Sequence, residues 1–162
     1  MPRFNFAQRS AAAAAVATLA LAASASVAAA DPLAKLSGSW SGAGQFRLEN
    51  GRSEALRCSA FYSPKRDALG LSLRCASPSN RIELRARLVS RGNRVSGTWE
   101  ERSYNVSGSV SGVGSGNSLR LGINGGGLSG FMVVTTTGGS QSISMRTDGA
   151  ALRGINISLR RN

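Results

Sequence analysis

The chain has 162 residues, of which 20 are Lys or Arg, eight are Asp or Glu and none is His, giving a net charge of +12. The lack of histidine excludes Ser-His and Cys-His nucleophile systems and histidine metal sites. The excess of cations, mostly arginine, favours an anionic partner, because guanidinium groups bind phosphates and carboxylates in a bidentate manner.

Residues 1–30 have the features of a secretory signal peptide. Two arginines give a basic start, residues 11–23 form an apolar run, and small residues lead up to Ala30. The run is shorter than the ~20 apolar residues that a membrane-spanning helix needs, and no basic stop-transfer cluster follows it. We therefore predict cleavage near Ala30 and a periplasmic or secreted bacterial protein, residues 31–162, with no transmembrane segment.

The mature chain has the length of one domain, and its pattern is that of an all-β protein. Short alternating runs are separated by Gly, Asn, Ser and Pro about every ten residues, and no helical periodicity appears after residue 35. The predicted strands are 38–48, 53–63, 69–76, 81–90, 94–101, 105–112, 118–124, 128–136, 141–147 and 152–160. Their short links predict an antiparallel up-and-down meander. We expect it to close into a barrel, which removes exposed edges, with a β-sandwich as the alternative.

The clearest strand, 81–90, shows how the faces divide. Its apolar side chains share one face and its charged side chains share the other: Ile82, Leu84, Ala86 and Leu88 against Arg81, Glu83, Arg85 and Arg87. Such alternation is typical of an antiparallel sheet with one buried face.

Two cysteines, Cys58 and Cys75, fall on the apolar faces of adjacent predicted strands. In an exported chain an even pair of cysteines predicts one disulfide. If the two lie opposite each other, the hairpin between them turns at Arg66-Asp67, just after Pro64. Two thiolates without histidine make a poor metal site, so we expect no metal and no cofactor.

The start of the first strand, Gly38-Ser39-Trp40, resembles the Gly-x-Trp start of calycins, the lipocalin and avidin-like barrels. The resemblance implies that Trp40 lies across a closed end of the barrel with a cation from near the last strand packed over it. Arg160, or with less support Arg153, would be that cation. The second lipocalin motif, the C-terminal helix and the long first loop of lipocalins have no counterpart here.

A second resemblance is to small exported β-proteins of Gram-negative bacteria. It rests on the Trp-Ser-Gly start, an Arg-Cys pair on two adjacent strands and Gly97-Thr-Trp-Glu100. This resemblance implies no particular activity.

The acidic residues do not form a recognisable catalytic pair. Glu100 and Glu101 are adjacent, so on a strand they point to opposite faces. Glu83 points outward, and the remaining carboxylates lie in or beside turns. A glycosidase needs two carboxyl groups that flank one sugar bond. We therefore predict that the protein is not an enzyme.

The first functional hypothesis is a barrel that holds a small apolar or amphipathic ligand. Inward glycines at positions 42, 44 and 97 would leave room for the ligand. The residues expected to line the interior are Trp40, Phe46, Trp99 and Phe131. The same aromatic residues would equally serve as ordinary core.

The second hypothesis is a basic module that contacts an anionic envelope component or a protein. It rests on a candidate basic patch on the outer faces of neighbouring strands: Arg57, Arg74, Arg85 and Arg87. Binding through such a patch would weaken with salt. Nucleic acid is the less expected partner, and arginines that simply solvate an outer face are the alternative.

Overall fold

A computed structural model of the chain describes residues 30–149 and 151–162. The predicted signal peptide therefore lies outside the described residues, apart from Ala30. Within the described part of the chain, no helix is long and apolar enough to cross a bilayer.

In the residues that the structure describes, ten antiparallel strands follow one short 3₁₀ helix, and together they confirm the all-β prediction. The elements are η1 (Ala34–Leu36), β1 (Gly38–Leu48), β2 (Ser53–Lys65), β3 (Ala68–Ala76), β4 (Arg81–Arg91), β5 (Arg94–Glu101), β6 (Val106–Ser115), β7 (Ser118–Gly125), β8 (Leu128–Thr137), β9 (Ser140–Asp148) and β10 (Leu152–Arg161). The largest boundary difference is the end of β6, predicted at 112. The strand continues because Val113, Gly114 and Ser115 stay in register with β7.

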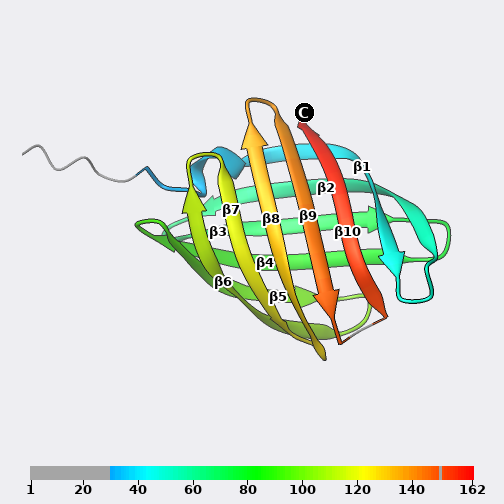
Figure 1. Cartoon of the computed structure of the whole chain (residues 1–162). Coiled ribbons are helices and arrows are strands. Elements are labelled where there is room, and N and C mark those ends of the chain that lie inside the picture. Colours follow the sequence, from blue (N-terminus) through cyan, green and yellow to red (C-terminus); the bar gives the residue numbers. More distant parts are fainter. Residues whose placement is uncertain (1–29, 150) are drawn as a thin grey trace, which may run out of the picture.

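The strands form a closed barrel in which each strand pairs with its neighbours in sequence and β1 pairs with β10. This confirms the meander and decides against the sandwich alternative. Figure 1 shows two crossing layers, with β2, β3 and β4 running across the far layer and β7–β10 running steeply over the near one. Closure leaves no strand edge open to pair with another chain.

Glycines on β1 allow the sheet to bend where it meets β10. A Cβ on Gly42 would lie 2.0 Å from the carbonyl oxygen of Ser158, and one on Gly44 would lie 2.1 Å from that of Asn156. Gly97 on β5 is equally constrained, 2.1 Å from the carbonyl oxygen of Arg87. The expectation that these glycines leave room for a ligand was wrong, because the backbone of the adjacent strand fills the space. They permit the close approach that a coiled sheet requires.

The disulfide prediction is confirmed. Cys58 on β2 lies opposite Cys75 on β3, with their Cα atoms 4.1 Å apart, and the two are bonded. Both are buried on the inner face. The hairpin between them turns at Arg66-Asp67, between the end of β2 and the start of β3. The bond holds the register in which the apolar sides of both strands face inward.

Candidate functional site

One end of the barrel is closed by the N-terminal segment. Leu33 and Leu36 are buried there against Trp40, which has no exposed surface. The indole Nε1 of Trp40 donates a hydrogen bond of 2.8 Å to the carbonyl oxygen of Leu36. Arg161 lies over the indole ring and donates to the carbonyl oxygens of Lys35, at 2.8 Å, and Ser37. Its guanidinium group thus ties the helix η1 to the last strand.

The cation over Trp40 is Arg161, so the prediction of Arg160, with Arg153 as second choice, was wrong. In the β1–β10 register Arg161 lies opposite Trp40, whereas Arg160 lies opposite the outward-facing Ser41. Arg153 lies near the other end of β10, where it pairs with Glu49 and Asp148. Alternation from the inward Ile157 and Leu159 would have identified position 161 from the sequence.

Three buried polar side chains form a row of hydrogen bonds across the barrel near its closed end. The Tyr62 hydroxyl on β2 donates to Oε1 of Gln141 on β9 at 3.0 Å, and Nε2 of Gln141 donates to Oγ1 of Thr136 at 3.3 Å. Gln141 is only 2% exposed. Burial raises the pKa of the Tyr62 hydroxyl, and the hydrogen bond to Gln141 offsets this only in part. Gln141 was not predicted from the sequence, because its only signal is its place in the alternation of β9.

The interior is less tightly covered toward the opposite end, which in the described residues carries only the turns between strands. Inward apolar side chains from both layers remain half-buried there and along the middle of the barrel, where they pack against the core. They are Leu48, Leu71, Leu73, Ile82, Leu84, Ala86, Val106, Ile123, Met132, Leu152 and Ile155. Solvent therefore reaches apolar groups on the inner surface at this open end.

Two of the remaining predicted lining residues lie inside. Phe46 is buried near the open end of β1. Trp99 on β5 is buried against Gly108, and its Nε1 donates to the carbonyl oxygen of Ser109 at 3.1 Å.

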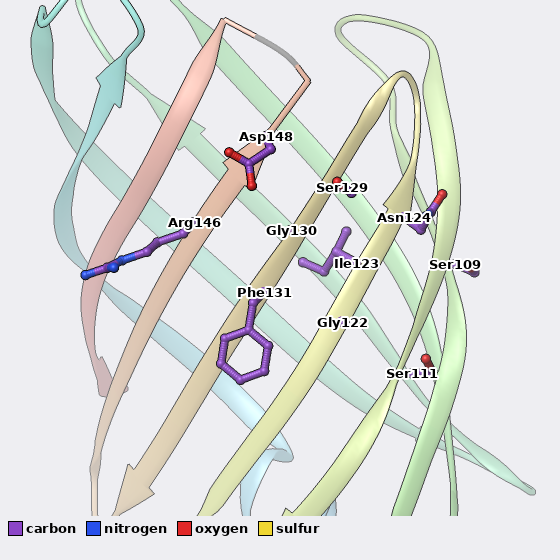
Figure 2. A pocket seen from close by; sticks show the side chains of 10 residues that line it. All are labelled: Ser109, Ser111, Gly122, Ile123, Asn124, Ser129, Gly130, Phe131, Arg146 and Asp148. Atoms are coloured by element: carbon purple, nitrogen blue, oxygen red, sulfur yellow. The ribbon is translucent and has the colours of Figure 1, made fainter.

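Phe131 does not line the interior, and this prediction was wrong. It is 50% exposed on the outer face of β8, because Met132 and Val134 take the inward positions. Four consecutive apolar residues, 131–134, left the phase of this strand ambiguous in the sequence. Phe131 lines a groove of about 460 Å³ on the outer side of β6–β9. Figure 2 shows the side chains that line this groove.

The four arginines of the candidate basic patch share the outer face of β2–β4, and all four are exposed. Two of them are partly neutralised. Arg74 lies 3.5 Å from Glu83, and Arg87 lies 2.7 Å from Asp67. Arg85 lies opposite Glu100 in the register with β5. The patch is therefore less cationic than its arginines alone suggest.

A carboxylate organises the rim at the open end. Glu54 at the start of β2 accepts hydrogen bonds from the hydroxyls of Ser79 and Ser77, the latter at 2.7 Å. These two bonds hold the pKa of Glu54 below its ordinary value of 4.5, and nearby Arg52 acts in the same direction. Glu54 thereby anchors the turn between β3 and β4 to β2.

A second carboxylate at the open end, Glu101 at the end of β5, holds the start of β4 and the turn after β5 together. The buried Glu101 accepts backbone hydrogen bonds from Glu83 at 2.6 Å and from Tyr104 at 2.7 Å. Across residues 30–149 and 151–162, no group of three His, Cys, Asp or Glu side chains is placed to hold a metal ion.

Solved structures with a similar fold are known. No family model matches the chain, and no curated protein matches it. Among solved structures, Rv2717c from M. tuberculosis matches with a TM-score of 0.69 and 15% identity, over 80% of this chain and 94% of that one. The S-type phycobiliprotein lyase CPES from Guillardia theta matches with a TM-score of 0.59 and 9% identity, over 79% and 89%. The chain thus shares the fold of these structures, and its own strands form a closed antiparallel barrel.

These comparisons correct the prediction that the chain is not an enzyme. One of the two similar barrels is a lyase, so the fold is compatible with catalysis. The absence of histidine and of a facing carboxylate pair excludes only the kinds of catalysis that depend on those groups. At 9% identity the likeness establishes the fold, and lyase activity belongs to that protein.

Proposed function

We propose that this protein binds a small apolar or amphipathic ligand at the open end of its barrel. The observation that carries the proposal is the uneven burial of the inner surface. At the closed end Trp40 and its neighbours exclude water, whereas inward side chains such as Leu84 and Met132 keep solvent access. Covering these side chains would stabilise a complex by about 25 cal/mol per Å² of apolar surface removed from water.

The ligand-binding proposal is tested by native mass spectrometry of the protein purified from its own cells. A bound small mass is expected, and the barrel freed of that mass should bind the dye anilinonaphthalene sulfonate. Leu84→Asn, on the half-buried inner face, should weaken both signals. Val113→Asn on the outer face, where Val113 is 43% exposed, is the matched control. A barrel that carries no adduct and binds no dye would contradict the proposal.

We also propose that the protein is exported. The disulfide between Cys58 and Cys75 supports this, because such bonds persist in oxidising compartments. The signal-peptide pattern of residues 1–30 points the same way.

A second candidate function is attachment to an anionic envelope component through the patch of Arg57, Arg74, Arg85 and Arg87. Their common outer face on three adjacent strands favours it. The test is sedimentation with vesicles of anionic or zwitterionic lipid at low and high salt. Binding to anionic vesicles alone, lost at high salt and in Arg57→Ala/Arg85→Ala, would support it. Equal binding to both lipids would contradict it.

A further inference from the structure

The outer side of β6–β9 carries the groove of about 460 Å³ shown in Figure 2, which we call the outer groove. It lies on the opposite side of the barrel wall from the apolar inner surface, so a ligand here is independent of the ligand proposed for the open end. Two cross-strand rows of side chains form it.

The first row places the exposed ring of Phe131 beside a glycine, which has no side chain to cover it. Ser111, Gly122, Phe131 and Arg146 lie opposite one another on four successive strands. Gly122 has an ordinary strand conformation, and a Cβ there would meet only the backbone oxygen of Ser111, at 3.6 Å. The space between Ser111 and Phe131 is therefore open, and the Phe131 ring remains accessible from that side.

The second row is polar. Ser109, Asn124, Ser129 and Asp148 lie opposite one another on the same strands. The side chains of Ser109, Asn124 and Ser129 are exposed on the outer face, and Asp148 has Arg153 at 3.7 Å. Hydroxyl, amide and carboxylate groups thus stand exposed along about 14 Å, the width of four strands.

These features restrict the kind of ligand. An extended peptide cannot add as a strand, because the backbones of β6–β9 already pair on both sides within the closed barrel. A polyanion is disfavoured, because the residues that line the groove include one cation, Arg146, and one carboxylate, Asp148, and so offer no excess of positive charge. The groove instead offers an apolar ring face beside short donors and acceptors.

A neutral saccharide has the matching chemistry. One face of a pyranose ring presents C–H groups that pack on an aromatic face, and its rim presents hydroxyls that both donate and accept hydrogen bonds. We propose that the outer groove binds a short segment of a neutral saccharide chain. Phe131 supports one sugar ring over Gly122, and Asn124, Ser129 and Asp148 bind the hydroxyls of that ring or of its neighbour.

The probes are cellohexaose, maltohexaose, laminarihexaose and chitohexaose, titrated separately into the full mature protein by calorimetry. At least one of the four should bind with a Kd below about 1 mM. Phe131→Ala should weaken that binding about tenfold or more by removing the ring. Gly122→Val should abolish saccharide binding, because the new side chain fills the space beside Phe131. This strand position tolerates a side chain.

The matched control is Phe61→Ala, since Phe61 is 52% exposed on the outer face of β2 and Phe131 is 50% exposed on β8. Phe61→Ala should bind the saccharide as the natural protein does. Thermal unfolding of each variant checks that it is folded. The proposal is overturned if none of the four probes binds. It is also overturned if folded Phe131→Ala and Gly122→Val bind normally, or if Phe61→Ala loses as much affinity as Phe131→Ala.

Discussion

The guanidinium carbon of Arg161 lies 4.2 Å from the centroid of the Trp40 indole ring, at the closed end of the barrel. The two residues are opposite each other in the strand pair β1–β10 that closes the sheet. Arg161 also donates hydrogen bonds to the carbonyl oxygens of Lys35 and Ser37, which flank the end of η1. One side chain therefore couples ring closure to the packing of the N-terminal segment.

Arg161→Ala should lower the free energy of unfolding by about 1–3 kcal/mol, from the lost cation–π contact and hydrogen bonds. Arg160→Ala removes the same charge from the outward neighbour and should change it by less than about 0.5 kcal/mol. Urea unfolding followed by tryptophan fluorescence measures both. Equal effects of the two variants would show that the position over Trp40 has no special role.

Replacing both Cys58 and Cys75 with Ala should destabilise the barrel by about 3 kcal/mol, because the bond closes a loop between residues 17 apart. Reduction of the natural protein should produce a similar loss in urea unfolding. A double variant as stable as the oxidised protein would mean that the β2–β3 register is held by packing alone.

Gly42→Ala should cost about 2–4 kcal/mol, because its methyl group would lie 2.0 Å from the carbonyl oxygen of Ser158 and force β1 and β10 apart. Gly122→Ala adds the same methyl group to open space on β7 and should stay within about 0.5 kcal/mol of the natural protein. Thermal unfolding compares the pair. A tolerated Gly42→Ala would show that the sheet does not need this close approach to bend.

Stability should fall in acid through Glu54. Its pKa is held below 4.5 in the folded state, chiefly by the hydroxyl of Ser79 and then that of Ser77. A lowered folded-state pKa contributes stability that is complete above the unfolded-state value and is lost as the pH falls toward the folded-state value. Urea unfolding between about pH 7 and about pH 3 should show this loss below pH 4.5.

The control for the acid transition is Glu54→Gln, which cannot ionise. Its unfolding free energy should be lower than that of the natural protein near neutral pH, and the difference should shrink as the medium becomes acidic. A difference that does not change with pH would rule out Glu54 as a source of the acid sensitivity.

Processing of the N-terminus tests the export proposal. Mass spectrometry of the protein from its own cells should find a chain that begins at Asp31, in the periplasm or the medium, with the disulfide formed. A chain that retains residues 1–30 in the cytoplasm with reduced cysteines would contradict it.

The local pattern was enough to determine much of the fold. Alternation along 81–90 assigned the inner and outer faces of β4, and turn residues such as Asn50-Gly51 and Arg66-Asp67 set the ends of the strands. Short links imposed the order of neighbours, and the two cysteines predicted the β2–β3 register. These features were readable because each depends on residues close together in the chain.

Only the tertiary structure decided what meets across the barrel. Tyr62 and Gln141 are 79 residues apart and become hydrogen-bonded only after the sheet bends and closes. The same closure brings Arg161 over Trp40, seals one end, and assembles the outer groove from four strands. The period of a strand specifies which face a side chain occupies. The distance between two faces depends on how far the whole sheet coils, which no single strand encodes.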